Sequence, residues 1–320
     1  MRTSIFSAFG FGHRKLTTAL PRNCTLRQAL EKYLAEISSQ KRSGKQEQSV
    51  ARVWCRSALA DVQLRKIRPG DLVNARDEWL KVAAAGTVVR RLALVSHLYT
   101  IARKEWGFEE MRNPVDLIRK PKVRNARERR ILVDLNVPGM PASEFDWLLL
   151  HSRSRLFRSM MVIAVETAMR RAEVAGLRWE NINFERRTAY LPQTKNGHPR
   201  TVPLSPRALD ELKSWRHGET NSGRVYETSP GAFTRAFNRS RFRCKKRYED
   251  LCRLHGLELN PKYFCNLHLH DLRHEAISKM APLFQMHELA RISGHRDTRM
   301  LMRYYHPDVG EFATRLAEAA

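Results

Sequence analysis

The sequence predicts a mainly α-helical (α+β) protein, in which an N-terminal helical bundle precedes a second, mostly helical domain with a small antiparallel sheet. The length supports this division, because 320 residues have room for about two domains of ordinary size, each with its own core. Helical periodicity runs through residues 24–112 without a strand pattern. Beyond residue 131 the helical pattern is interrupted by two short strand-like segments.

Residues 24–112 are predicted to form a compact bundle of four helices. In the first helix, over residues 25–38, Thr25 and Gln28 form a capping-box pattern and apolar residues recur on one face. A Pro-Gly pair precedes the third helix, and Gly107 ends the fourth. The second, third and fourth helices are expected over residues 47–60, 71–82 and 87–106.

Residues 1–23 are expected to form a basic N-terminal arm. Residues 1–27 contain five basic residues and no acid, a composition that organellar transit peptides share and that leaves targeting as the alternative. Glycine and serine interrupt residues 4–12, so this stretch is not the apolar core of a signal peptide.

Residues 113–130 are predicted to be a basic, extended linker, because the helical periodicity stops there. From Arg119 to Arg130, seven positive charges are offset only by Glu128, and they repel one another unless a polyanion lies alongside. A solvated surface loop is the alternative. The candidate contacts to such a polyanion are Arg119, Lys120, Lys122 and Arg124.

Residues 131–320 form the second predicted domain, which opens with helical pattern over residues 144–168. Two short strands are expected over residues 187–191 and 200–204, with Asn-Gly between them as a turn signal and a proline that confines the second strand to an edge. Helical pattern then continues to the C-terminus. An apolar stripe in the last segment suits burial on a neighbouring subunit or on its own subunit; it comprises Val309, Phe312, Leu316 and Ala319.

The charge predicts a polyanionic partner, either nucleic acid or an anionic membrane surface. The chain has 58 Lys and Arg residues against 33 Asp and Glu, a formal net charge of +25. No membrane span is expected, since the longest apolar stretch, residues 160–165, is far shorter than the ~20 residues that cross a bilayer. The five cysteines are scattered and include no Cys-x-x-Cys pair, which is typical of a reduced, cytoplasmic protein.

Four separated segments carry candidate catalytic residues. In chain order, these residues are Arg170 and Glu173, Lys195, His270 and Arg273, and His295 and Tyr304. Their pattern is Arg-x-x-Glu after a buried helix, a lysine at a hairpin turn, His-x-x-Arg, and Gly-His with a tyrosine nine positions beyond the histidine. In this order the segments resemble the tyrosine recombinase (phage integrase) family. Their amino-acid sequences are particularly similar to those of shufflon-type DNA invertases and related plasmid or phage integrases. The N-terminal bundle resembles the DNA core-binding domain of that family.

The chemistry of the family explains these residue types. Cleaving a DNA phosphodiester with a side-chain hydroxyl requires a nucleophile, cations for the non-bridging oxygens and an acid for the leaving 5′-oxygen. The planar guanidinium groups of Arg170 and Arg273 suit two phosphate oxygens, and Lys195 beside a tight turn can reach the site as the general acid. Tyr304 is the expected nucleophile and is preferred to Tyr305 by its spacing from the histidine.

The remaining candidates support this chemistry. His270 is the expected acceptor of the phenolic proton, because a free phenol has a pKa of about 10 and needs activation. His295 is expected to hydrogen-bond the phosphate or the developing charge, and Glu173, one helical turn from Arg170, to orient the basic cluster. Taken singly, each of these residues is more often a cap, a solvated charge or a structural group, so the prediction depends on the ordered set.

Two other clusters lie in the second domain. One is rich in histidine and cysteine, and its spacing fits no common zinc finger or ribbon, so no metal is predicted. Its members are Cys252, His255, Cys265, His268, His270 and His274. The other is a run of basic residues. It is either a solvated helix face or a helix that contacts DNA phosphates, and the second interpretation is favoured if the chain binds DNA. The DNA contacts chosen from it are Arg239, Arg243 and Lys246. The segment of residues 229–270 is longer and more basic than the corresponding segment usually is in the family.

The resemblance implies an enzyme, a site-specific recombinase that cleaves and rejoins duplex DNA through a 3′-phosphotyrosyl intermediate during integration, inversion or excision. It implies double-stranded DNA recombination sites as partners and a homotetramer on that DNA. No metal or nucleotide cofactor is expected, because the phosphotyrosyl bond retains the energy for religation. The alternatives are a type IB topoisomerase and a catalytically silent DNA-binding relative. The complete residue set argues against the silent relative, and relaxation of a plasmid without paired sites would identify a topoisomerase.

Overall fold

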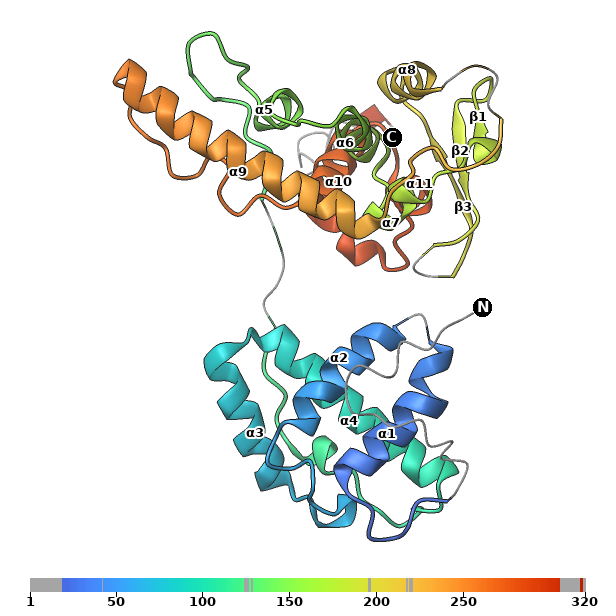
Figure 1. The fold of residues 1–320 in the computed structure, drawn as a ribbon. Helices are drawn as coiled ribbons and strands as arrows, with labels where there is room; N and C mark the ends of the chain where they lie inside the picture. Colours follow the sequence, from blue (N-terminus) through green and yellow to red (C-terminus); the bar gives the residue numbers. More distant parts are fainter. Residues whose placement is uncertain are drawn as a thin grey trace. The chain divides into compact units, whose positions relative to one another are not determined.

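The chain divides into two compact units, Met1–Arg127 and Glu128–Ala320 (Figure 1). The structure, a computed structural model, describes residues 19–41, 43–123, 127, 129–194, 197–216, 218, 221–305 and 317–318. Each unit has its own hydrophobic core. The expected fold class, mainly α with one small antiparallel sheet, is confirmed.

The described part of the first unit is helical. Its α-helices are α1 (Leu26–Glu36), α2 (Gly44–Cys55), α3 (Pro69–Val82) and α4 (Ala85–Glu105), and its 3₁₀ turns are η2 (Ser38–Gln40), η3 (Leu64–Lys66) and η4 (Pro114–Leu117). The predicted capping box begins α1, because the Gln28 amide donates to the Thr25 hydroxyl at 3.3 Å and the Thr25 amide donates to the Gln28 side chain at 3.0 Å. Trp54 and Tyr99 are fully buried in the core.

The second helix ends earlier than the sequence predicts. It was expected over residues 47–60, whereas α2 ends at Cys55. The chain after α2 turns back to the start of α1, where the Leu26 amide donates to the Val62 carbonyl at 3.0 Å and the Leu64 amide to the Cys24 carbonyl at 2.8 Å. These long-range hydrogen bonds satisfy the backbone outside the helix, which a local periodicity does not reveal.

The second unit is built around α6 (Arg155–Thr167), which is buried from Ser159 to Val165. Helices α8 (Pro206–Trp215) and α10 (Leu269–Met280) pack against α6. The other elements are α5 (Glu144–Leu150), α7 (Arg171–Ala175), α9 (Pro230–His255), α11 (Met286–Ser293), η5 (Trp179–Asn181), η6 (Thr298–Met300) and η7 (Met302–Tyr304). The helix expected over residues 144–168 is in fact two helices, α5 and α6. The Ser152 hydroxyl donates to the Ser154 carbonyl at the break, a local turn that competes with the helix.

The sheet has the strands β1 (Ile182–Asn183), β2 (Thr188–Leu191) and β3 (Arg200–Pro203), in the order β1-β2-β3 and antiparallel throughout. Ala189 pairs with Val202, and the two predicted strands are confirmed. The two-residue strand β1 is too short to give a period-2 pattern. Strand β3 lies at an edge, as its proline predicts, and packs against α11. This packing brings the first residue of β3 to the end of α11.

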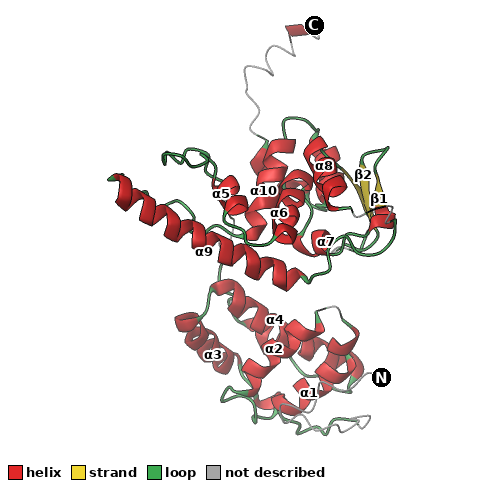
Figure 2. Cartoon of the chain, turned by 45° about the horizontal axis from the view of Figure 1, so that its top comes forward, coloured by secondary structure: helices red, strands yellow, loops and turns green. Residues whose placement is uncertain are grey.

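The basic segment before residue 270 forms the long helix α9 (Figure 2). Helix α9 packs on α5, α6, α7 and α10, and it buries Phe233, Phe237 and Tyr248. It ends at Gly256, whose φ of +61° is a left-handed conformation that favours glycine. Most exposed positions of α9 are basic, among them Arg235, Arg239, Lys245, Lys246 and Arg247, although Phe242 is exposed as well.

Among the described residues, no helix combines the length and the apolar character needed to cross a bilayer. The His, Cys, Asp and Glu side chains of this part of the chain form no group of three or more that could hold a metal ion. Of the cysteines in the histidine- and cysteine-rich cluster, Cys252 is buried in the core of the second unit and Cys265 is exposed.

Candidate active site

Arg170 lies at the start of α7, where the chain leaves the buried helix α6. Ala168 ends α6 with a left-handed φ of 53°, and Arg170 becomes the N-cap of α7. The backbone amide of Arg170 donates to Oε2 of Glu173 at 2.7 Å, and Nη1 of the Arg170 side chain donates to Oε1 of Glu173 at 3.1 Å. Its Nη2 donates to the Gly294 carbonyl at 2.9 Å. The arginine is therefore fixed from two sides, by an acid on its own helix and by the end of α11.

Glu173 also binds a second arginine, Arg200, which the sequence prediction did not include. Nη1 of Arg200 lies 2.9 Å from Oε1 of Glu173, and Nη2 lies 2.6 Å from Oε2. Burial by itself would raise the pKa of the Glu173 carboxyl, but the hydrogen bonds and charges of Arg200 and Arg170 lower it to about 2. Glu173 is thus an anion that holds both guanidinium groups.

A sequence signal for Arg200 exists in the strand pattern. Arg200 and Val202 lie on the same face of β3, and Val202 is fully buried. A charged residue on the buried face of a strand requires a partner. In the structure the Arg200 side chain is almost buried, and its Nε also donates to the Ile292 carbonyl at 2.9 Å.

Arg273, on α10, is buried beside Arg170. Its Nη2 donates to the Ser293 carbonyl at 2.6 Å, and its Nη1 donates to the Ala168 carbonyl. Burial, together with the charges of Arg170 and Arg200, lowers the pKa of Arg273 to about 9, so the group remains a cation at neutral pH. A guanidinium has five N–H donors, so Arg273 can hold both carbonyls and still donate to an anion.

Gly294 follows the last residue of α11 and precedes His295. Because it has no side chain, the arginines can approach its backbone closely. Its φ of +71° is left-handed, and a Cβ there would lie 3.0 Å from Nη1 of Arg200 and 3.2 Å from Nη1 of Arg170. The glycine of the Gly-His motif therefore leaves room for the guanidinium cluster.

Two histidines of the site, His270 and His295, lie in surroundings that lower their pKa values. Burial, His274 and Arg273 lower the pKa of His270 to about 4. Burial, Arg273 and Arg170 lower the pKa of His295 to about 4, and Nδ1 of His295 lies 2.7 Å from the Ser293 hydroxyl. A neutral imidazole has one donor and one acceptor nitrogen, so both rings can hydrogen-bond a phosphate or its surroundings at neutral pH.

The structure brings Tyr304, rather than Tyr305, to the histidines. The Tyr304 hydroxyl is hydrogen-bonded to Nδ1 of His274, a residue that the prediction did not place in the catalytic set. Burial raises the pKa of Tyr304, although Arg303, Arg273 and Arg130 oppose this effect. The Tyr305 hydroxyl instead donates to the Phe284 carbonyl at 2.8 Å, a structural contact.

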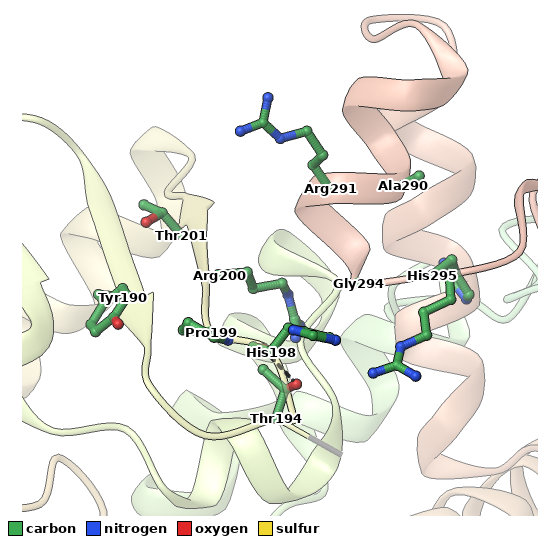
Figure 3. Close-up of a pocket in the computed structure, with 11 residues that line it drawn as sticks. Tyr190, Thr194, His198, Pro199, Arg200, Thr201, Ala290, Arg291, Gly294 and His295 are labelled. Atoms are coloured by element: carbon green, nitrogen blue, oxygen red, sulfur yellow. Dashed lines mark hydrogen bonds between the residues drawn. The ribbon is translucent and has the colours of Figure 1, made fainter. Parts of the chain in front are cut away.

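A groove of about 470 Å³ lies between the β2–β3 hairpin and the end of α11 (Figure 3). In Figure 3, Arg200 extends from β3 toward Gly294, with His198 and Thr194 at the end of the hairpin. The Thr194 hydroxyl donates to the His198 carbonyl at 2.8 Å. Lys195, the predicted general acid, lies outside the described residues.

The predicted DNA contacts differ in their surroundings. In the linker and on α9, most of them are exposed: Arg119, Lys120, Lys122, Arg239 and Lys246. Arg124 lies outside the described residues. Arg243 is half-buried, and its Nε donates to the His151 carbonyl at 2.9 Å, so part of its role is structural.

The end of the basic linker also has a structural role. Arg129 Nη2 lies 2.6 Å from Oε1 of the buried Glu144, and Arg130 Nε lies 3.0 Å from Oε2 of Glu275. Two of the seven positive charges are therefore neutralised by acids from the second unit. The local sequence did not reveal this, because Glu275 is 145 residues from Arg130.

The chain belongs to the phage integrase family, whose model matches residues 148–311. It is a tyrosine-type site-specific recombinase, and it acts on DNA.

The relatives agree with this family. The chain is 36% identical over 307 residues to a shufflon-specific DNA recombinase of Escherichia coli, covering 92% of this chain and 72% of the relative. It is 34% identical over 291 residues to a putative integrase/recombinase of Haemophilus influenzae, covering 90% and 74%. Because these relatives are named as recombinases or integrases, they give no support to the topoisomerase or the silent DNA-binding alternative.

Solved structures share the fold. A lambda integrase dimer bound to a COC′ core site superimposes with a TM-score of 0.66 at 20% identity, over 88% of this chain and 95% of the other. A lambda integrase tetramer bound to a Holliday junction has a TM-score of 0.65 at 19% identity, over 87% and 79%.

Proposed function

We propose that Tyr304 is the nucleophile that attacks a DNA phosphate and that Arg170 and Arg273 bind the non-bridging oxygens of that phosphate. One observation carries this proposal. Arg170 and Arg273 donate to the carbonyls of two consecutive residues, Gly294 and Ser293, so two cations from separate helices meet at one place. His295 follows directly in the chain, and the Tyr304 hydroxyl is bonded to the residue after Arg273.

In the proposed reaction the Tyr304 oxygen forms a bond to phosphorus, and the bond from phosphorus to the 5′-oxygen breaks. The two guanidinium groups stabilise the charge on the non-bridging oxygens during this step. Lys195 protonates the leaving 5′-oxygen, and His270 and His295 hydrogen-bond the phosphate. Glu173 keeps Arg170 and Arg200 in place. Attack of a 5′-hydroxyl on the phosphotyrosine reverses the step and rejoins the DNA, so no cofactor is required.

The proposal extends to the parts of the chain that contact DNA. Residues 24–112 serve as a core-binding domain, residues 113–130 as a DNA-contacting linker and residues 131–320 as the catalytic domain, with residues 1–23 as a basic arm. The exposure of the basic residues supports this assignment on the linker and on α9, at Arg119, Lys120, Lys122, Arg239 and Lys246.

The proposed assembly is a homotetramer on two recombination sites, and the proposed location is the cytoplasm. The tetramer of lambda integrase on a Holliday junction supports this assembly by analogy of fold. The apolar stripe at Val309, Phe312, Leu316 and Ala319, which is proposed to bury on a neighbouring subunit, lies outside the described residues.

Mapping the covalent adduct tests the proposal. The protein is incubated with a nicked duplex recombination site, from which the cleaved end diffuses away, and the trapped product is digested and sequenced by mass spectrometry. The nucleotide is expected on the peptide containing Tyr304, attached through the 3′-phosphate, with a free 5′-hydroxyl on the released strand. Attachment elsewhere, or through a 5′-phosphate, would overturn the proposal.

A further inference from the structure

His274 forms a hydrogen bond with the hydroxyl of Tyr304. The bond joins Nδ1 of His274 to the phenolic oxygen, and the two ring centroids are 6.0 Å apart with 32° between the planes. His270, one helical turn earlier on α10, has its ring centroid 4.8 Å from that of His274, with the planes at 81°. His274 therefore contacts the nucleophile on one side and the predicted proton acceptor on the other.

We propose, on the basis of the function above, that His274 accepts the proton of Tyr304 when the tyrosine attacks DNA. The O–H bond of Tyr304 breaks, and its proton moves to Nδ1 of His274. The phenolic oxygen then bonds to phosphorus, and the 5′-oxygen leaves with the electron pair of the broken P–O bond. During religation the proton returns from His274 to the phenolic oxygen.

The surroundings of Tyr304 make a base necessary. Burial raises the pKa of this phenol, so it does not ionise unaided at neutral pH. A general base must lie within hydrogen-bond reach of the proton it removes, and His274 meets that requirement. In the tautomer with its proton on Nε2, Nδ1 is the acceptor nitrogen of the ring.

This assignment also gives His270 a separate task. His270 was expected to accept the phenolic proton, but the hydroxyl is bonded to His274 instead. Helix α10 carries both rings on either side of Arg273. His270 is then available, as a neutral ring beside Arg273, to hydrogen-bond the phosphate.

Two substitutions separate a base from a positioning residue. In His274→Asn, the amide oxygen takes the place of Nδ1 and can accept the hydroxyl hydrogen bond, but it cannot take the proton. In His274→Ala, both abilities are lost, and the space admits imidazole from solution. The matched control is His287→Ala, because His287 is an exposed histidine on α11 outside the site.

The measurement is the single-turnover rate of covalent adduct formation on a nicked duplex site, with DNA binding and thermal unfolding recorded for each variant. We expect His274→Ala and His274→Asn to be slower by about 10²–10⁴-fold, the usual contribution of a general base. Added imidazole should restore His274→Ala at least tenfold and should not restore Tyr304→Phe. The control should react at the wild-type rate.

A rate within threefold of wild type for His274→Asn would overturn the proposal, because hydrogen bonding alone would then suffice. Failure of imidazole to restore a folded His274→Ala would also overturn it. If His274→Ala does not fold, the rate of His274→Asn decides alone. These results differ from failure of the proposed function, in which the wild-type protein itself forms no adduct at Tyr304.

Discussion

Arg200 and Glu173 form a two-pronged ion pair, with Nη1 2.9 Å from Oε1 and Nη2 2.6 Å from Oε2. The pair joins the first residue of β3 to α7, and it lies almost entirely out of solvent. Since Glu173 also binds Arg170, strand β3 is coupled to a proposed phosphate-binding arginine. Three charged groups, one of them the buried Glu173, thus form one ion-paired unit.

Removing Arg200 is expected to destabilise the second unit. In Arg200→Met the side chain keeps its length, but Glu173 loses its bidentate partner, and breaking a buried pair in this way costs about 3 kcal/mol. Urea unfolding measures the change. The control, Arg253→Met, removes an exposed ion pair with Asp250 on α9 and should cost less than about 1 kcal/mol. Equal effects for the two variants would contradict the structural role of Arg200.

Stability is expected to depend on pH through Glu173. Its pKa falls from an ordinary value of 4.5 to about 2 in the folded protein, so the carboxylate contributes stability above pH 4.5 and loses it as pH falls toward 2. The contribution is about 3 kcal/mol, at 1.36 kcal/mol per pKa unit. Urea unfolding between pH 6 and 2.5 should show a shallower decline for Glu173→Gln than for the wild type. Parallel declines would mean that Glu173 is not held as an anion.

The parts of the site that the sequence could predict are those in which a local motif fixes the geometry. The Arg-x-x-Glu spacing predicts that Glu173 lies one turn from Arg170, and the structure has this contact. The link between Arg200 and Glu173 spans 27 residues and two elements, so it depends on how β3 packs. Likewise, His274 is next to a predicted catalytic arginine, but its contact with Tyr304 arises from the placement of η7. In the fold, capping and turn signals located α1 and the hairpin, whereas α2 ends early because of hydrogen bonds from distant residues.

The role of Lys195 is tested by changing the leaving group. If Lys195 protonates the 5′-oxygen, Lys195→Ala should slow cleavage of ordinary DNA by about 10²–10⁴-fold. When sulfur replaces the 5′-bridging oxygen, the released strand leaves as a stable thiolate and needs no acid. The defect of Lys195→Ala should therefore largely disappear in single-turnover cleavage of this substrate. Arg273→Ala should stay impaired on both substrates, because the non-bridging oxygens still require a cation. If Lys195→Ala is equally slow on both, Lys195 is not the acid.

DNA affinity should depend steeply on salt. Each neutralised phosphate contributes about −0.9 to the slope of log K against log salt, so a chain with many basic contacts should give a slope steeper than roughly −5. Lys246→Gln should reduce the steepness by about 0.9, since Lys246 is exposed on α9. Arg243→Gln should change stability more than the slope, because Arg243 holds the His151 carbonyl. Fluorescence anisotropy titrations measure both, and a wild-type slope near −1 would exclude extensive phosphate contact.

The choice between the two adjacent tyrosines tests the central claim most directly. Tyr304→Phe removes the hydroxyl that contacts His274, whereas Tyr305→Phe removes one that donates to the Phe284 carbonyl. Each variant is incubated with a nicked, end-labelled duplex site, and transfer of label to protein is measured on a denaturing gel. Tyr304→Phe should bind the site with wild-type affinity and form no labelled protein, while Tyr305→Phe should still become labelled. Labelling of Tyr304→Phe, together with its loss in Tyr305→Phe, would contradict the account.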